Sequence, residues 1–198
     1  MNLKSISKKI RKTILNTIYT AKTGHIGGSL SCVDILISLY FGKHLKFDPK
    51  KPKLKDRDRL IVSKGHATAA YYSVLAHLGF IKISELQTYC RNNTRLATHL
   101  SGSVPGVEFD TGSLGHGLGI ACGLAYSAKI DKKKYKVFAL ISDGELYEGS
   151  VWEALLFASH YKLNNLIIIV DRNNQIVMDK TEDCIKLNPL EKKFKSFG

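Results

Sequence analysis

The chain has 198 residues, of which 44% are hydrophobic and 24% are charged. This composition predicts one globular domain with a sizeable core, and it excludes a disordered, collagen-like or low-complexity chain. The apolar runs, such as residues 166–170, are far shorter than the roughly 20 residues that span a bilayer, so we expect no membrane partner.

Thirty basic residues against seventeen acidic ones give a net charge of +13. This excess suits nucleic acid, an anionic surface or phosphate-bearing small molecules. Aromatic side chains do not alternate with the basic ones as a base-stacking platform requires, so we expect no nucleic-acid binding. The four cysteines lack a metal-binding spacing, and the N-terminus leads into lysines rather than an apolar signal core. Both features predict a cytoplasmic protein with reduced thiols.

The first half of the chain predicts three helices and one strand. Apolar residues recur every three or four positions over residues 3–18, with lysines opposite, which indicates an amphipathic helix that stops by Gly24. The largely apolar segment at residues 32–41 then predicts a well-buried second helix. After it we expect a charged loop at 43–59, a buried strand at 60–63 and a third helix at 67–78.

The second half predicts alternating strands and helices. Residues 91–117 form a long connection, and such loops in compact domains are usually functional or disordered. The strands at 136–141 and 166–171 are apolar on both faces, which is typical of a parallel sheet covered by helices. With helices at 118–128 and 150–161, the pattern predicts an α/β fold with helices on both faces of a parallel sheet.

Polar residues follow both of these strands. Asp143 and Asn173 lie one strand–helix–strand crossover apart, so neighbouring strands would bring them together. A carboxylate and an amide oxygen suit Mg²⁺, and Gly144 would let a phosphate approach the backbone at a helix N-terminus. Taken singly, Asp143 is equally compatible with a helix cap and Asn173 with a turn.

Four ordered stretches resemble one family. Residues 142–149 (SDGELYEG), continuing to 170–175 (VDRNNQ), are similar to the thiamine diphosphate motif, which begins G-D-G and ends about 30 residues later in Asn. Residues 21–28, 60–66 and 105–115 also match, in order, the N-terminal domain of transketolase in the form encoded as a separate subunit. The resemblance implies a single thiamine diphosphate-binding domain over residues 1–198, with its last C-terminal elements missing.

The resemblance also implies residue roles. Mg²⁺, or Ca²⁺ or Mn²⁺ in its place, would be bound by Asp143, Asn173 and the Gln175 carbonyl. The thiamine diphosphate itself would be bordered by one histidine, by the loop at 112–114 and by the turns at 143–145 and 173. The residues expected at the cofactor are His66, Gly112, Ser113, Leu114, Asp143, Gly144, Glu145 and Asn173; those expected to act on substrate are His25, His66 and His99; and those expected at a dimer contact are Glu148 and Glu153.

Two departures from the family pattern stand out. Ser142 replaces the first glycine of G-D-G, and His116 stands where transketolases often have Gln. In the family that the chain resembles, the glutamate that activates the cofactor lies on a pyrimidine-binding domain, and none of the four matching stretches belongs to that domain. The resemblance therefore implies a C-terminal partner subunit, an α₂β₂ assembly, and transfer of a two-carbon ketol unit between phosphosugars or modified sugars. The alternatives are a subunit of a 1-deoxyxylulose-5-phosphate synthase-like or dehydrogenase-like enzyme, and a truncated, non-catalytic chain that binds a partner.

Overall fold

The computed structural model describes residues 2–177 and 179–198, which form two compact units. The first unit comprises the chain up to Asp58 together with Gly65–Gly112, and the second comprises Arg59–Lys64 and Ser113–Gly198. The chain therefore passes from one unit to the other three times. No helix in the described part of the chain is both long and apolar enough to cross a membrane.

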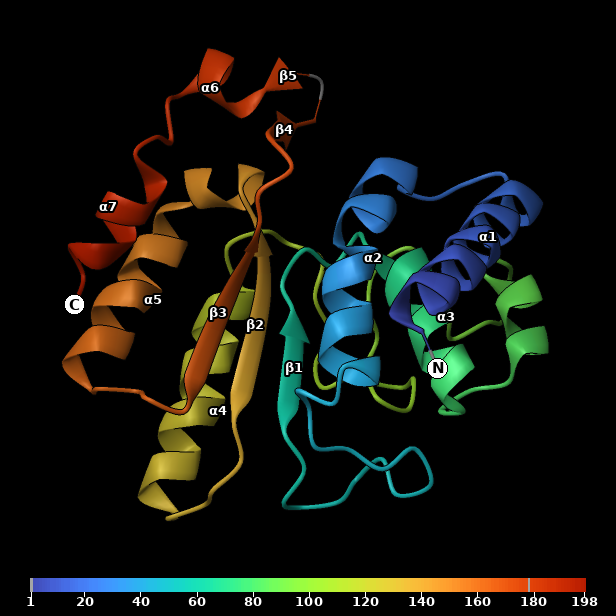
Figure 1. Cartoon of the computed structure of the whole chain (residues 1–198), viewed down its shortest axis with the longest axis horizontal. Helices are drawn as coiled ribbons and strands as arrows, with labels where there is room; N and C mark the ends of the chain where they lie inside the picture. The colour runs from blue at the N-terminus through green and yellow to red at the C-terminus, as the bar shows by residue number, and fades with distance from the viewer. Residues whose placement is uncertain (1, 178) are drawn as a thin grey trace. The chain divides into compact units, whose positions relative to one another are not determined.

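Three mutually packed helices build the first unit (Figure 1). The predicted stripe of α1 is largely confirmed, since Ile6, Ile10 and Ile14 are buried, although Leu3 is exposed. Asn2 caps this helix by accepting a hydrogen bond from the Lys4 N–H at 3.0 Å. The elements of this unit are α1 (Leu3–Ala21), α2 (Ile26–Phe41), α3 (Thr68–Leu78) and the 3₁₀ helix η1 (Ile83–Thr88).

The helix α2 begins six residues earlier than predicted. Its first turn contains Gly27, Gly28 and Ser29, which are poor helix formers by themselves. Ser29 is fully buried, so packing of this turn outweighs its weak local preference. The loops predicted at 43–59 and 91–117 lack regular helix or strand, apart from one bridge between Leu100 and Thr111. Only their last residues differ from the prediction, because Arg59 already belongs to β1 and Gly117 to α4.

A three-stranded parallel sheet forms the centre of the second unit, in the order β1-β2-β3. In register, Arg59 pairs with Val137 and Ser142 pairs with Asp171. This confirms the predicted α/β class, and β3 has the predicted bounds. The strands and the helices packed around them are β1 (Arg59–Val62), α4 (Gly117–Ile130), β2 (Val137–Ser142), η2 (Gly144–Tyr147), α5 (Gly149–His160) and β3 (Leu166–Asp171).

Small side chains let the second unit pack closely. Ala121 and Ala125 of α4 lie in one cluster with Ala139 of β2 and with Ala154 of α5. Figure 1 shows α4 running along the sheet. Four short elements beyond β3 were not predicted: β4 (Gln175–Ile176), β5 (Asp179–Lys180), α6 (Thr181–Cys184) and α7 (Leu190–Lys195).

Candidate functional site

The turn after β2 holds the Asp143 carboxylate beside the turn after β3. Asp143 is fully buried, and its Oδ1 accepts a hydrogen bond from the Gly144 N–H at 2.9 Å. Its Oδ2 accepts one from the Asn174 N–H at 2.6 Å and one from Arg172 Nη1 at 3.0 Å. The parallel pairing of β2 with β3 therefore brings the two predicted turns together, as the crossover spacing indicated.

Asn173 and Gln175 belong to the same turn. The Asn173 Oδ1 accepts a hydrogen bond from the Gln175 N–H at 2.9 Å. The Gln175 carbonyl oxygen lies 3.3 Å from the point where a Cβ on Gly144 would stand, so the absence of a side chain at Gly144 keeps this space open. Glycine thus leaves backbone from both turns accessible at the carboxyl edge of the sheet.

These oxygen donors fit a magnesium–diphosphate group. A carboxylate, an amide oxygen and a backbone carbonyl are the hard ligands that Mg²⁺ prefers, and Mg²⁺ usually takes few protein ligands with phosphate and water as the rest. The described residues contain no group of three or more His, Cys, Asp or Glu side chains that would hold a metal ion by themselves. A cation at Asp143 would accordingly depend on neutral oxygens and on a phosphate ligand.

Arg172 was not predicted as part of the site, yet its guanidinium contacts Asp143 directly. Besides Asp143, Nη1 donates to Thr181 Oγ1 at 2.9 Å. Nη2 donates to Glu182 Oε1 at 2.7 Å and to Asn188 Oδ1 at 3.4 Å. The arginine therefore connects the buried carboxylate to residues 181–188. The sequence could have indicated this role, because Arg172 stands between Asp171 and Asn173 in the predicted turn.

Glu145 is committed to contacts within the protein. Its carboxylate is fully buried and accepts hydrogen bonds from the Ser63 hydroxyl, from the Gly115 N–H at 2.8 Å and from the Ser142 N–H at 3.3 Å. Burial raises the pKa of Glu145, and these hydrogen bonds oppose the rise. The carboxylate thus fastens the loop at Gly115 to the ends of β1 and β2, while the prediction that it borders the cofactor stays a prediction.

The loop before α4 is fixed at Gly115. This residue has φ +85°, and a Cβ there would lie 2.6 Å from Glu148 Cβ, so a side chain is excluded. The Ser150 hydroxyl donates to the Gly115 carbonyl at 2.9 Å. Just before this anchor, Ser113 is exposed and Leu114 is half-buried. A tightly held loop therefore presents two of the residues predicted at the cofactor.

Three predicted histidines gather in the first unit. The ring centroids of His25 and His66 lie 5.3 Å apart, and those of His25 and His99 lie 6.3 Å apart. A Cβ on Gly28 would stand 2.8 Å from the His66 ring, and one on Gly112 would stand 3.0 Å from His99 Cδ2. These glycines let the imidazoles lie close to the backbone, and His25 and His99 are exposed.

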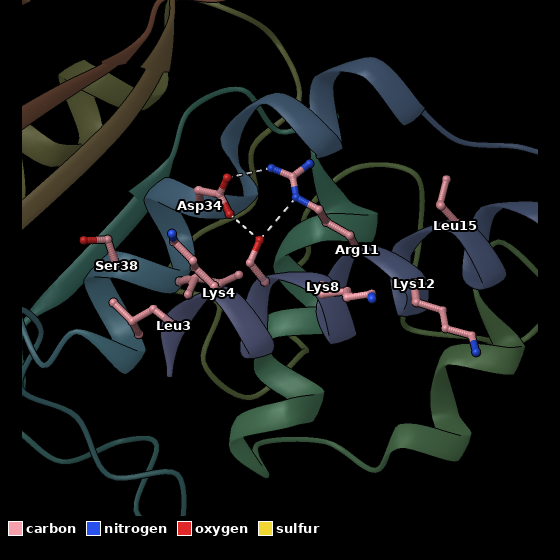
Figure 2. A pocket seen from close by; sticks show the side chains of 10 residues that line it. Leu3, Lys4, Lys8, Arg11, Lys12, Leu15, Asp34 and Ser38 are labelled. Atoms are coloured by element: carbon pink, nitrogen blue, oxygen red, sulfur yellow. Dashed lines mark hydrogen bonds and ion pairs between the residues drawn. The ribbon is translucent and has the colours of Figure 1, made fainter. Parts of the chain in front are cut away.

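The groove in Figure 2 is separate from these residues. It lies between α1 and α2 of the first unit and is lined by lysine stems and by Leu3, Leu15 and Ile37. Arg11 Nη2 crosses it to Asp34 Oδ2 at 2.7 Å. None of the residues predicted for the site lines this groove.

An α/β unit with an Asp-Gly turn, a following Asn turn and a glycine-anchored loop fits the class of thiamine diphosphate-binding proteins. The family model described as "Transketolase, thiamine diphosphate binding domain" matches residues 3–198. The chain therefore belongs to the transketolase family, as its thiamine diphosphate-binding domain.

Separately named transketolase subunits are among its relatives. The chain is 42% identical over 192 residues to an apulose-4-phosphate transketolase subunit of Phocaeicola vulgatus, covering 97% of this chain and 68% of the relative. It is 38% identical over 199 residues to the 6-deoxy-6-sulfo-D-fructose transketolase subunit SqwG of Clostridium sp., covering 100% of this chain and 72% of the relative.

Solved transketolases share the fold. The Campylobacter jejuni transketolase superposes with a TM-score of 0.94 at 33% identity, and the Leishmania mexicana enzyme with 0.93 at 26%. This chain is covered completely in both comparisons but spans 33% and 31% of those chains, respectively. The likeness therefore concerns one domain of each larger enzyme.

Proposed function

We propose that this chain is the diphosphate-binding subunit of a split transketolase that moves a two-carbon ketol unit from a ketose to an aldose. The observation that carries the proposal is the meeting of Asp143 with the turn at residues 172–175 at the carboxyl edge of a parallel sheet. The relatives that are named as transketolase subunits support a separately encoded partner. That partner would bring the pyrimidine-binding domain and its activating glutamate, in an α₂β₂ assembly.

In the second unit, Asp143, Asn173 and the Gln175 carbonyl would hold Mg²⁺, and Gly144, which has no side chain, would let the diphosphate approach the backbone. Ser113 and Leu114 would border the cofactor from their anchored loop. Bound thiamine diphosphate supplies the carbanion chemistry of ketol transfer. The residues of this chain would bind and orient it.

In the first unit, the imidazoles of His25, His66 and His99 would hydrogen-bond sugar hydroxyls and diphosphate oxygens and hold protons there. Their clustering within one unit supports this assignment. Gly112, which packs against His99, would border the cofactor beside them.

The substrates we propose are phosphosugars or related anionic sugars. The net charge of +13 supports this class, because a basic protein attracts anionic ligands and raises their encounter rate. The named substrates of two relatives, a sugar phosphate and a sulfonated sugar, are both anionic. We further propose a cytoplasmic location, which the absence of disulfides among the described residues supports.

The test is native mass spectrometry of the chain, tagged and purified gently from its own cells. We expect a complex with a second polypeptide that retains thiamine diphosphate and Mg²⁺. The Asp143→Ala variant should keep the partner and lose the cofactor. A chain that carries neither partner nor cofactor would contradict the proposal and favour the non-catalytic alternative.

A further inference from the structure

Three charged side chains, those of Asp143, Arg172 and Glu182, form a linked set in which the positive charge offsets one of the two negative charges. Arg172 is shared by two carboxylates, with Nη1 3.0 Å from Asp143 Oδ2 and Nη2 2.7 Å from Glu182 Oε1. The three groups sum to one negative charge. The other oxygens proposed to bind the metal, at Asn173 and Gln175, are neutral.

We propose that Arg172 makes metal binding at Asp143 conditional on the diphosphate. This inference rests on the proposed function, because it concerns the same site. A dication that approaches Asp143 Oδ2 meets the fixed guanidinium charge on that oxygen. Its binding is therefore weak until a ligand with several negative charges, such as a diphosphate, is present to offset Arg172.

Several contacts keep Arg172 in this place. Thr181 Oγ1 and Asn188 Oδ1 also accept hydrogen bonds from it. Glu182 Oε1 is itself held by the Leu187 N–H at 3.1 Å and the Asn188 N–H at 3.3 Å. The Tyr147 hydroxyl oxygen lies 2.5 Å from the Thr181 carbonyl oxygen and 2.9 Å from the Ile185 carbonyl oxygen, so its one proton is shared between the two. Both terminal nitrogens of the guanidinium, Nη1 and Nη2, are therefore held by hydrogen-bond acceptors that are themselves fixed.

Asp143 keeps its orientation without the arginine. The Asn174 and Gly144 N–H groups hold its two oxygens at 2.6 Å and 2.9 Å. Removing the Arg172 charge should therefore leave the carboxylate in place and raise its attraction for cations. Tighter metal binding after removal of Arg172 would therefore show that its charge matters. If Arg172 only stabilised the structure, its removal would weaken metal binding.

A charge series on the full chain tests the inference, with Mn²⁺ as the probe and free Mn²⁺ measured by electron paramagnetic resonance. Without thiamine diphosphate, Arg172→Gln should bind Mn²⁺ on the order of tenfold more tightly than the parent. Glu182→Gln should bind it more weakly, and the double variant should return close to the parent. With saturating thiamine diphosphate, the differences should shrink.

Arg172→Lys is the matched control, because it keeps the charge and loses the planar fork. We expect it to retain the weak Mn²⁺ binding of the parent, and a Lys variant that binds as tightly as Arg172→Gln would overturn the inference. Weaker or unchanged binding in Arg172→Gln would also overturn it. If Asp143→Ala abolishes Mn²⁺ binding in the presence of cofactor while Arg172→Gln shows no tightening, the inference fails and the proposed site stands. If Asp143→Ala changes nothing, the proposed site itself is wrong.

Discussion

Lys64 Nζ lies 2.5 Å from Asp171 Oδ2, and both side chains are buried, with exposures of 0% and 6%. The pair connects the end of β1 with the last residue of β3, and β2 lies between these strands in the sheet. Taking two charges out of water costs several kcal/mol per ion, and their attraction offsets this cost only while both are present. The pair therefore ties the two outer strands together at their carboxyl ends.

Replacing one member of this pair should be strongly destabilising. We expect Lys64→Met to lower the free energy of unfolding by about 3–5 kcal/mol, because the Asp171 carboxylate stays buried without Lys64. The double variant Lys64→Met/Asp171→Leu should lose far less than the sum of the two single changes. Urea unfolding monitored by circular dichroism measures all three, and additive losses would contradict a coupled pair.

Two glycines of α4 provide a matched comparison. A Cβ on Gly117 would lie 2.7 Å from the Ser63 Cα, whereas one on Gly119 meets nothing within 4 Å. Gly117→Ala should therefore destabilise the chain by about 1–3 kcal/mol through overpacking. Gly119→Ala should stabilise it by about 0.5–1 kcal/mol through helix propensity. Thermal unfolding of both variants checks this, and equal effects would show that Ser63 yields to the new methyl group.

His77 should make stability depend on pH. Burial lowers the pKa of His77, Lys9 lowers it further, and the Nε2 lies 2.9 Å from Thr13 Oγ1. A folded-state pKa below the unfolded value of about 6.5 means that the unfolded chain binds the proton more readily. The contribution is therefore present above about pH 6.5 and is lost as the pH falls through the lowered pKa.

The measurement is the urea midpoint of unfolding between pH 5 and pH 7.5. His77→Gln should flatten the fall in stability on the acid side. His160→Gln is the control, because His160 is exposed at the end of α5, and it should follow the parent curve. A parallel shift of the His77→Gln curve, without flattening, would exclude a titrating role.

Glu148 and Glu153 are exposed at the start and in the first turns of α5, where the family resemblance predicts a dimer contact. We expect Glu153→Arg to prevent the proposed α₂β₂ assembly while the unfolding free energy of the chain stays within about 0.5 kcal/mol, as is usual for exposed positions. Sedimentation velocity measures the assembly. Glu191→Arg, an exposed glutamate in α7, makes the same charge change and should leave the assembly intact.

The elements that the sequence predicted well are those with a strong local pattern. β3 is an unbroken apolar run bounded by polar residues, and its predicted bounds are the observed ones. The spacing of Asp143 and Asn173 predicted that their turns would meet, because parallel strands place successive carboxyl ends at one edge. The gathering of His25, His66 and His99 followed from the family motifs and not from any local pattern.

Other features depend on distant partners and left no local signal. The buried positions of Lys64 and Glu145 depend on Asp171 and Gly115, which are 107 and 30 residues away. Lysine and glutamate are ordinarily surface residues, so composition alone indicates exposure. The short elements beyond β3 are likewise held by side chains such as Tyr147, whose hydroxyl binds two of their carbonyls.

The position of β1 in the chain has a consequence for folding during synthesis. Arg59 of β1 pairs with Val137 of β2, so 78 residues separate the two partners along the chain. At about 5–20 residues per second, a ribosome needs roughly 4–16 s to make that intervening stretch. Throughout this interval, the apolar residues 60–62 of β1 have been made before their neighbouring strand exists. The pairing of β1 with β2 therefore has a high contact order, and the apolar first strand is exposed to aggregation until β2 has been made.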